Sequence, residues 1–398
     1  MARRRIAVLG STGSIGRGVL DVVARLPEAF EVVSLAASTS AALLAEQAAR
    51  FGARRVAVGA DTRGDFGPGV RVLRGPAGLE ELAGDPDADL VVNAVVGASG
   101  LRPTMAALRA GKLLALANKE SLVMAGEIVT RTAREAGGEI VPIDSEHSAI
   151  FRSLAAARRG EVTSLVLTAS GGALRDVPVE RVGDVTVAEV LRHPTWSMGA
   201  KVTVDSATLV NKALEVIEAR WLFDVPLDRI GIVMHRESVV HSLVRLSDGS
   251  FLAHLGEPDM RIPIQYALCY PEPGALDLGS WSPGESRQLS FEDVDPRRYP
   301  ALGIVLRAAE AGGTAPAAAA AADEVAVEAF IAGRVRFADI ARIIEETVSR
   351  TPDGPCGSVE DVLEADARAR EIARTCAGGA HASRAGGGGS AATPTGAR

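Results

Sequence analysis

The chain begins with a short apolar strand, residues 5–9, that runs directly into a glycine-rich turn, residues 10–16. The glycines of this turn have the spacing GxxGxxG, and a helical pattern of valines and leucines follows. Glycine at such a junction permits a tight turn, lets backbone N–H groups approach a pyrophosphate, and lets the helix pack on the strand. The arrangement predicts a dinucleotide-binding unit at the N-terminus; a purely structural left-handed turn is the alternative.

Further apolar runs alternate with helical patterns along the first 147 residues. The strand-like runs are residues 31–36, 55–58, 70–73, 90–96, 113–117 and 139–143. This alternation predicts a largely parallel, doubly wound sheet. Ligands of such sheets bind beyond the C-terminal ends of the strands, so the polar residues that follow these runs are candidates for a site.

The end of the second strand bears on the choice of coenzyme. An NAD-specific site usually places Asp or Glu there to hold the ribose 2′-OH. This chain has Ser38, Thr39 and Ser40 instead. The missing acid favours NADP, because a carboxylate would repel its 2′-phosphate. Since no arginine or lysine stands at this strand end, the hydroxyl groups are the expected donors to that phosphate.

Charged residues follow two of the later strands. Residues 139–143 run into Asp144, Ser145 and Glu146, and an extended backbone would place both carboxylates on one side. Neighbouring carboxylates stay ionised at low cost when a cation lies between them. The alternative is a strand that runs into a helix N-cap. Lys119 stands one residue beyond an apolar run, which is too deep for a purely solvated charge, whereas Asn118 could simply cap a helix.

A second α/β region begins near residue 148. Its first strand, residues 164–167, leads into Ser170 and two glycines, and a polar excursion then closes at residues 193–199, HPTWSMG. Glycines at both ends and the aromatic Trp196 predict a lid over residues 170–199. The alternative is an ordinary excursion packed by Trp196, and His193 alone would more often be structural.

A helix is expected from Asp205, as N-cap, to residue 222. Its spacing places Asn211 and Lys212 beside Glu215. An amide, an ammonium and a serine hydroxyl at one helix start would suit a phosphate, and Glu215 could supply a third carboxylate. The alternative is a surface helix with an ordinary lysine–glutamate pair. Residues 233–255 predict a hairpin with structural histidines, and residues 301–376 predict a small helical domain.

Bulk properties narrow the class of protein. The 398 residues suggest two or three domains, and the net charge of -7 argues against nucleic acid or an anionic membrane as the main partner. The three cysteines are odd in number and follow no metal spacing, so we expect reduced thiols in a cytoplasmic protein. The sequence offers no stretch apolar enough to predict a membrane span. The tail after residue 376 is expected to stay disordered.

Seven stretches of the chain, in order, resemble the 1-deoxy-D-xylulose 5-phosphate reductoisomerase family. They are residues 10–16, 117–122, 142–151, 167–172, 193–199, 205–223 and 255–261. ANKES, DSEHSAIF and HPTWSMG are long and specific, and the similarity covers all but the tail. The resemblance implies a homodimer that uses NADPH and a divalent metal, Mg²⁺ or Mn²⁺. It would convert the sugar phosphate 1-deoxy-D-xylulose 5-phosphate to 2-C-methyl-D-erythritol 4-phosphate in the non-mevalonate isoprenoid pathway.

The resemblance also implies an α/β fold of several units. Residues 1–147 would form a doubly wound Rossmann-like NADP-binding domain, and residues 148–285 a central α/β catalytic and dimerisation domain that contains the lid. Residues 286–300 would be a connection, residues 301–376 a small helical domain and residues 377–398 a tail. The family's asparagine-rich helix start is replaced by an alanine run, residues 317–322, followed by Asp323. Because that domain is remote from the chemistry, we expect a packing change only.

Site residues carry over position by position. The coenzyme set is Thr12, Gly13, Ser14, Ile15, Asn118, Glu120 and Gly199, together with Ser38, Thr39 and Ser40, which depart from the family's usual pattern. The metal ligands are Asp144, Glu146 and Glu215. The substrate set is Lys119, Ser145, Glu146, Ser170, His193, Ser206, Asn211, Lys212 and Glu215, of which Ser170, Ser206, Asn211 and Lys212 hold the phosphate. The catalytic set is Lys119, Asp144, Glu146, Glu215 and His193, and Trp196 and Met198 belong to the lid.

Two other functions remain open at this point. One is a different NADP-dependent oxidoreductase of an aldehyde or semialdehyde, which needs no three-carboxylate metal site. The other is a non-catalytic nucleotide-sensing module, which would not need Lys119, Glu215 and a lid together.

Overall fold

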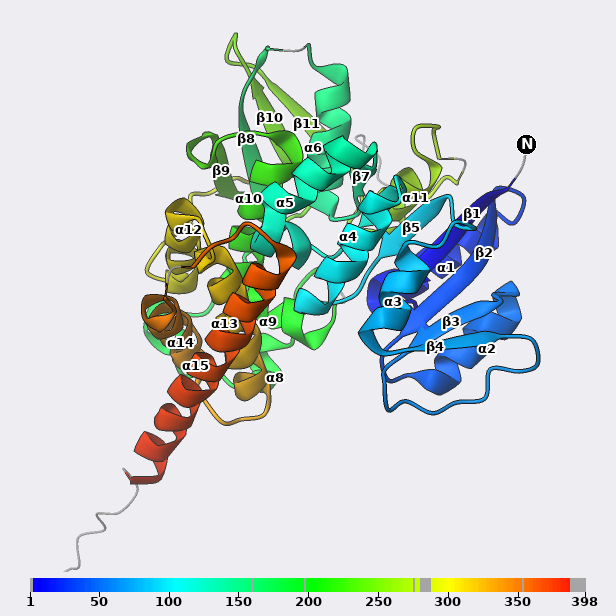
Figure 1. Cartoon of the computed structure of the whole chain (residues 1–398). Coiled ribbons are helices and arrows are strands. Elements are labelled where there is room, and N and C mark those ends of the chain that lie inside the picture. Colours follow the sequence, from blue (N-terminus) through cyan, green and yellow to red (C-terminus); the bar gives the residue numbers. More distant parts are fainter. Residues whose placement is uncertain are drawn as a thin grey trace, which may run out of the picture.

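Two sheets and a group of C-terminal helices make up the fold (Figure 1). The structure is a computed structural model, and it describes residues 3–158, 160–196, 198–274, 276–279, 288–352 and 354–386. Parts of the predicted units lie outside these residues: residues 1–2 of the first domain, residues 159, 197, 275 and 280–285 of the second, residues 286–287 of the connection, residue 353 of the helical domain and residues 387–398 of the tail.

The first sheet has seven parallel strands in the order β4-β3-β2-β1-β5-β6-β7. They are β1 (Arg4–Leu9), β2 (Phe30–Ala37), β3 (Arg55–Val58), β4 (Arg71–Arg74), β5 (Leu90–Asn93), β6 (Leu113–Leu116) and β7 (Glu139–Pro142). One face packs against α1 (Ser14–Arg25) and α2 (Ala41–Phe51), and the other against α3 (Gly75–Ala83), α4 (Leu101–Arg109) and α5 (Glu120–Ala136). The predicted doubly wound sheet is confirmed.

The glycine-rich turn joins β1 to α1. Gly10 has φ +82°, and a Cβ there would lie 2.4 Å from the carbonyl oxygen of Ala94. A Cβ on Gly16 would lie 2.2 Å from the carbonyl oxygen of Gly10. These two positions therefore require glycine for close packing. Gly13 is the N-cap of α1 and is exposed, so it leaves the start of the helix open to a ligand.

The second sheet has four strands in the order β11-β10-β8-β9. They are β8 (Val162–Ala169), β9 (Ile230–Met234), β10 (Val240–Leu246) and β11 (Phe251–Leu255). The predicted hairpin is confirmed for β10 and β11, which pair antiparallel. The start predicted for this hairpin, residue 233, is too early, because that residue belongs to β9, a separate strand that pairs parallel with β8. Helix α6 (Ser145–Ala156) packs on this second sheet, so the boundary predicted at residue 147 falls inside a helix.

Helix α11 (Arg261–Cys269) returns from the second sheet to the first. Its buried side chains Ile264 and Leu268 join the core of the seven-stranded sheet. Arg4 donates from Nη1 to the carbonyl oxygens of Leu268, at 2.7 Å, and Tyr270, at 2.8 Å. The segment predicted to belong to the second domain thus completes the core of the first.

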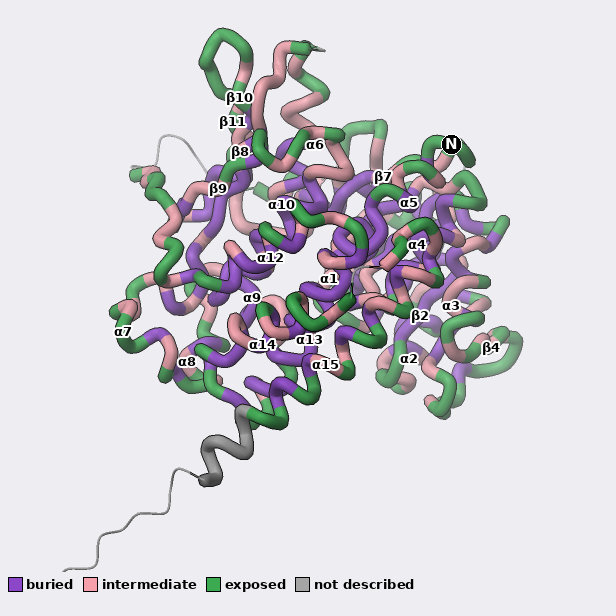
Figure 2. Tube along the Cα trace, turned by 60° about the vertical axis from the view of Figure 1, so that its left-hand side comes forward, coloured by how far each residue is buried: buried purple, intermediate pink, exposed green. Residues whose placement is uncertain are grey.

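The predicted helical domain is confirmed as α12 (Pro300–Ala311), α13 (Ala315–Ile331), α14 (Phe337–Arg350) and α15 (Val359–Gly386). The alanine run of α13 is almost fully buried (Figure 2), at 0–3% exposure. Its small side chains let neighbouring helices approach from several sides. Helix α15 continues past Cys376, so the end predicted there is wrong. Within the described helices, none has both the length and the hydropathy to cross a bilayer.

Candidate active site

The predicted site residues gather in a cavity of about 220 Å³ between the two sheets. Its walls come from the C-terminal edge of the seven-stranded sheet, the segment of residues 170–199, α9 (Ala200–Thr208) and α10 (Val210–Phe223). The predicted residues that line the cavity are Ser14, Ile15, Lys119, Asp144, Ser145, Glu146, Ser170, His193, Gly199, Ser206, Asn211, Lys212 and Glu215, with Trp196 and Met198 of the lid.

Asp144 is the N-cap of α6, where its Oδ1 accepts from the backbone N–H of Glu146 at 3.2 Å. The chain has already left the strand at this point, because β7 ends at Pro142. The extended geometry expected for Asp144 and Glu146 is therefore wrong, and the capping alternative is right. The cap still turns both carboxylates toward the cavity, since Glu146 stands in the first turn of α6.

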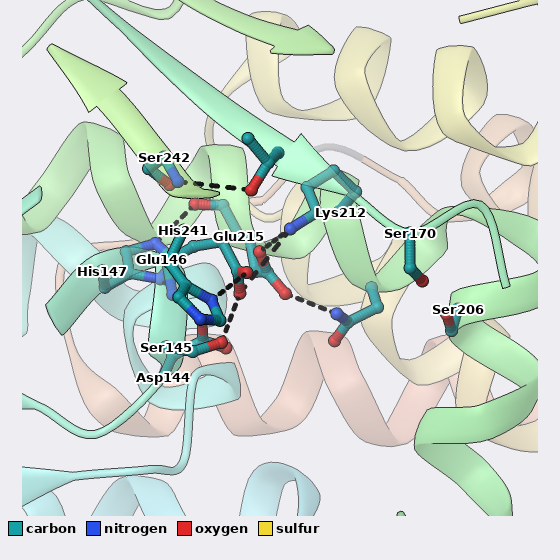
Figure 3. Close-up of polar contacts among 12 residues, drawn as sticks. Asp144, Ser145, Glu146, His147, Ser170, Ser206, Lys212, Glu215, His241 and Ser242 are labelled. Carbon is teal, nitrogen blue, oxygen red and sulfur yellow. Dashed lines mark hydrogen bonds and ion pairs between the residues drawn. The ribbon is translucent and has the colours of Figure 1, made fainter. Parts of the chain in front are cut away.

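Three carboxylates converge in the cavity. Oxygens of Asp144, Glu146 and Glu215 all lie within 4.8 Å of one another. Figure 3 shows them turned toward a common centre next to Lys212. Asp144 and Glu146 come from the start of α6, whereas Glu215 comes from α10, about 70 residues later in the chain. The predicted metal-ligand set is thus brought together by tertiary packing.

Two lysines, the buried Lys212 and the partly buried Lys119, offset the charge of these carboxylates. Lys119 Nζ lies 2.6 Å from Asp144 Oδ2 and 3.2 Å from Glu215 Oε1. Burial would lower the pKa of Lys119, but the two carboxylates more than offset this and hold it well above its ordinary value. Lys212 Nζ donates to Glu215 Oε2 and lies 3.8 Å from Glu146 Oε2. Burial would lower the pKa of Lys212 too, but Glu146 and Glu215 raise it.

The carboxylates differ in how well they are paired. Burial opposes ionisation of Asp144, but Lys119 keeps its pKa well below the usual range. Burial would raise the pKa of Glu146, but Lys212 lowers it. Burial and the charge of Asp144 raise the pKa of Glu215. A hard divalent cation fits this all-oxygen donor set, because it would relieve the repulsion that the lysines offset in part.

A histidine and a further glutamate stand behind the carboxylates. His147 Nδ1 lies 3.3 Å from Asp144 Oδ1 and 3.5 Å from Glu218 Oε2, while Nε2 lies 2.8 Å from the carbonyl oxygen of Glu215. Burial would lower the pKa of His147, but Glu218 and Asp144 raise it to about 9. His147 is therefore protonated on both ring nitrogens at neutral pH, and this positive charge holds Asp144 against α10.

Two of the expected phosphate ligands, Ser170 and Ser206, contact His193, whereas Asn211 and Lys212 contact Glu215. His193 Nε2 is 3.1 Å from Ser170 Oγ and 3.2 Å from Ser206 Oγ. Its Nδ1 accepts the backbone N–H groups of Thr195, at 3.1 Å, and Trp196, at 2.8 Å. The ring proton therefore sits on Nε2 and points at the serines. Burial and the charge of Arg175 lower the pKa of His193 to about 4, so the ring is neutral.

One long helix was predicted where the structure has two. Leu209 adopts φ 57° between α9 and α10, and this left-handed residue redirects the chain. Asn211 and Lys212 open α10, and both donate to Glu215 as their spacing indicated. Asp205 is wrong as an N-cap, because it lies buried within α9, where Lys201 Nζ approaches its Oδ2 at 2.6 Å.

Lys201 also reaches the helical domain. Its Nζ lies 2.7 Å from Oδ2 of Asp323 on α13, and both Asp205 and Asp323 are buried. Lys201 stands two residues after Gly199, where the predicted lid ends. The expectation of a packing change only at Asp323 is therefore wrong, since this residue forms an ion pair with Lys201 of α9, just beyond the predicted lid.

The predicted lid spans from β8 to α9 and contains α7 (Val179–Val182) and α8 (Val187–Val190). Gly171 and Gly172 at its start have φ +83° and +65°. The hydroxyl of Tyr299 donates to the carbonyl oxygen of Gly171 at 3.0 Å. At the other end, the Trp196 ring lies 6.2 Å from that of His241, edge to face. An apolar cover thus stands beside the carboxylates.

The expected coenzyme residues fall into three places. Ser14 and Ile15 line the cavity, with Thr12 and Gly13 next to them at the start of α1. Ser38, Thr39 and Ser40 are exposed beyond the end of β2. Asn118 and Glu120 are buried. Asn118 Nδ2 donates to the carbonyl oxygens of Val95, at 2.8 Å, and Gly97, at 3.0 Å, so this amide holds the loop after β5.

Several residues of the site were not predicted. His147 and Glu218 lie inside stretches that carry the family resemblance, DSEHSAIF and residues 205–223, so a signal was available. Ser238 lines the cavity with φ 52°, a strained conformation that its sequence does not signal. His241, expected to be structural, has Nδ1 3.7 Å from Glu146 Oε1. Val96 is 65% exposed just beyond β5, which places an apolar side chain at the coenzyme edge.

Comparison with known proteins gives one consistent family. Three family models match: "1-deoxy-D-xylulose 5-phosphate reductoisomerase" over residues 6–126, its C-terminal domain over residues 140–223, and "DXP reductoisomerase C-terminal domain" over residues 255–372. The 1-deoxy-D-xylulose 5-phosphate reductoisomerase of Anaeromyxobacter dehalogenans is 50% identical over 385 residues, 95% of this chain and 99% of that protein. That of Ralstonia nicotianae is 47% identical over 93% of this chain and 97% of its own.

Solved structures agree. A DOX-P reductoisomerase in complex with NADPH, fosmidomycin and magnesium superposes with a TM-score of 0.89 at 38% identity, covering 94% of this chain and 98% of that one. The 1-deoxy-D-xylulose 5-phosphate reductoisomerase from Zymomonas mobilis in complex with NADPH gives 0.82 at 38% identity, covering 94% and 99%.

The tautomer and low pKa of His193 predict a pH effect on stability. The folded pKa of about 4 lies below the ordinary 6.5, so the unfolded chain binds more protons between these values. His193 therefore contributes stability above pH 6.5 that is lost as the pH falls toward 4. Urea unfolding of the ligand-free protein at pH 6.5, 5.5 and 4.5 should show a steeper loss than the same series in His193→Gln. Parallel series would contradict a partly buried neutral ring at His193.

Proposed function

The chain belongs to the 1-deoxy-D-xylulose 5-phosphate reductoisomerase family, and we propose that the cavity between its two sheets is where it performs that family's reaction. The chain catalyses the NADPH-dependent rearrangement and reduction of 1-deoxy-D-xylulose 5-phosphate to 2-C-methyl-D-erythritol 4-phosphate in the non-mevalonate isoprenoid pathway. The observation that carries the proposal is the convergence of three carboxylates beside Lys119. Neither a plain aldehyde oxidoreductase nor a nucleotide sensor needs such a set.

Asp144, Glu146 and Glu215 are the proposed ligands of Mg²⁺ or Mn²⁺. When bound, the divalent cation supplies Lewis-acid stabilisation to the substrate's carbonyl and neighbouring hydroxyl oxygens. The three side chains hold fixed positions, because Asp144 caps α6 and Glu215 is anchored by Asn211 and Lys212. Such preorganisation lowers the cost of rearranging the site during reaction.

Lys119 is proposed to act on the reacting oxygens. Its ammonium group is held between Asp144, Glu215 and Asn211 Oδ1, the last at 2.9 Å. The raised pKa keeps Lys119 protonated across the physiological range. It therefore serves as a fixed positive charge and hydrogen-bond donor, and stabilises negative charge that develops on substrate oxygen. Ser145 lines the same wall of the cavity.

The phosphate is proposed to bind at Ser170, Ser206 and His193. Nε2–H of His193 already points at both hydroxyl groups, so it can donate to a phosphate oxygen placed between them. Asn211 and Lys212 stand next to this place at the start of α10. Because phosphate is remote from the reacting carbons, its binding energy is available to order the enzyme around the substrate.

NADPH is proposed to lie along the C-terminal edge of the seven-stranded sheet. Its pyrophosphate would meet the open N-terminus of α1 at residues 12–15, and its adenosine end would reach Ser38, Thr39 and Ser40. When bound, the coenzyme supplies hydride to the rearranged substrate. Met198 and Gly199 line the cavity on the side of the lid and would close it around the nicotinamide.

We propose a homodimer that pairs through the second sheet. β11 is an edge strand, and its exposed side chains include Phe251 at 50% and Leu255 at 39%. These two lie on the same face, because positions of equal parity along a strand do so. An apolar edge strand is a template for association with a second copy.

The cytoplasm is the proposed location. All three cysteines fall within the described residues, and the structure has no disulfide between them. Reduced thiols are the rule in that compartment, where NADPH is also available.

The metal proposal predicts a selective loss in Glu215→Gln. The amide keeps the shape of the side chain but removes one of three ligand charges, so turnover should fall at least ~100-fold while NADPH affinity stays within a few-fold. Steady-state NADPH oxidation with the sugar phosphate, with and without EDTA, measures the first. Fluorescence titration with NADPH measures the second. Near-wild-type rates of the variant at low Mg²⁺ would show that the three-carboxylate site is wrong.

The lid proposal predicts ligand-dependent protection. Substrate with NADP⁺ should slow hydrogen exchange across residues 171–196 and change Trp196 fluorescence, because closure expels water. Lys212→Ala should abolish both effects, since it removes the main cation of the phosphate site. The analogue 1-deoxy-D-xylulose, which lacks the phosphate, should lose kcat as well as affinity. Equal exchange with and without ligands would make this segment a static excursion packed by Trp196.

The dimer proposal predicts a mass of about 82 kDa in sedimentation, twice the 41.2 kDa of one chain. Phe251→Lys should shift the protein toward the monomer, because a charge on an edge strand opposes pairing. Phe251→Tyr keeps an aromatic ring and serves as the control. A wild-type mass of 41.2 kDa would contradict the dimer.

A further inference from the structure

The end of β2, where the 2′-phosphate of NADPH is expected, has no basic residue adjacent in sequence. The three hydroxyl side chains of residues 38–40 are exposed there. Hydroxyl groups alone distinguish a dianionic phosphate weakly, because the strong phosphate contacts in proteins are charge-assisted. A cation from elsewhere in the chain is therefore needed to explain a preference for NADPH.

The sheet register brings a cationic residue, Arg74, near the end of β2. Ala37, the last residue of β2, pairs with Val58 of β3, and Val58 pairs with Arg74 of β4. The three residues thus form one row across parallel strands, at the edge where the coenzyme lies. Adjacent strands are about 4.8 Å apart, so the Cα of Arg74 is roughly 10 Å from that of Ala37. An arginine side chain can cover most of that distance.

The side chain of Arg74 is directed toward β2. Strand alternation puts it on the face of Val58 and Val72, which is the face covered by α2. Its Nη1 donates to the carbonyl oxygen of Thr62, and Thr62 Oγ1 donates to the carbonyl oxygen of Ser38 at 2.7 Å. The backbone N–H of Gly59 donates to the same oxygen at 2.9 Å. Two hydrogen bonds through Thr62 therefore link Arg74 to Ser38.

The guanidinium of Arg74 has donors left for a ligand. The residue is exposed, and among the described residues it forms no ion pair with a carboxylate. One of its five N–H groups is accounted for by Thr62, and the rest suit the paired oxygens of a phosphate. Arg63 is exposed in the same loop, but its Nη1 has a long contact of 3.4 Å with the carbonyl oxygen of Ala60. Arg74 is the better anchored of the two.

We propose that Arg74, delivered from β4, binds the 2′-phosphate of NADPH and sets the preference for this coenzyme over NADH. Ser38, Thr39 and Ser40 complete the phosphate site with hydroxyl groups. The proposal rests on the NADPH-dependent reaction stated above. It adds a specificity residue from a strand that touches neither the glycine-rich turn nor the reacting groups.

The test compares Arg74→Ala with Arg71→Ala, an arginine of the same strand that pairs with Glu81 Oε1 at 2.7 Å. Arg74→Ala should lower kcat/KM for NADPH by roughly 10- to 100-fold and leave that for NADH within about twofold, because one charge-assisted phosphate contact is lost. At saturating NADPH its kcat should stay near that of the wild type. Arg74→Lys should recover part of the loss, and Arg71→Ala should change neither coenzyme.

Calorimetry gives a readout that does not depend on turnover. The wild type should bind 2′,5′-ADP more tightly than 5′-AMP, and Arg74→Ala should erase this difference. Equal losses for both coenzymes would assign Arg74 a structural role and overturn the proposal, as would unchanged selectivity. Loss of selectivity in Arg63→Ala with Arg74→Ala unaffected would also overturn it. If the wild type failed to oxidise NADPH with the sugar phosphate, the proposed function itself would fail, whatever the fragments bind.

Discussion

Mutual repulsion among Asp144, Glu146 and Glu215 is the constraint on which the rest of this structure depends. Two unit charges 4.8 Å apart, the outer limit of this cluster, repel by about 3 kcal/mol at an effective dielectric constant of 20. The fold holds them there by supplying Lys119 and Lys212 in the cavity and His147 behind it. The proposed metal ligands stand in the N-cap and first turn of α6 and on the buried helix α10, so the centre keeps its shape.

The same arrangement explains why the molecule needs two sheets. The seven-stranded sheet delivers Lys119 and Asp144 at its C-terminal edge, where all its strands end together. Glu215 and the proposed phosphate ligands need a second support that can face this edge, and α9, α10 and the four-stranded sheet provide it. The two supports therefore meet at the carboxylates.

Much of the fold follows from local pattern. The parallel strands, the glycine-rich turn and the cap at Asp144 depend on neighbouring residues, so short stretches of sequence contain the information. Asn211, Lys212 and Glu215 were placed together correctly for the same reason, since their contacts follow helical spacing. Spacing left open the choice between a surface helix and a third metal ligand at Glu215, and the resemblance favoured the metal ligand.

What the sequence could not give are pairings set by tertiary packing. Asp205 was predicted as a cap because aspartate commonly starts helices. Its partner is Lys201, one turn earlier, and Lys201 also pairs with Asp323 of the helical domain. The helix breaks at Leu209, a left-handed residue that is not glycine, so the sequence does not indicate the break. Arg74 is distant in sequence from Ser38, and only the order of strands makes them neighbours. Such contacts depend on topology, which local propensity does not contain.

The return of α11 to the first sheet has a consequence for how the chain is made. Arg4 finds its hydrogen-bond partner at Leu268, 264 residues later. At about 5–20 residues per second, a ribosome needs roughly 13–50 s to supply that partner. During this interval the first sheet lacks α11, the helix that packs against α1 and β7 and adds Ile264 and Leu268 to its core. The nascent chain therefore presents an uncovered apolar surface to chaperones, and the N-terminal unit finishes folding only when most of the protein has been synthesised.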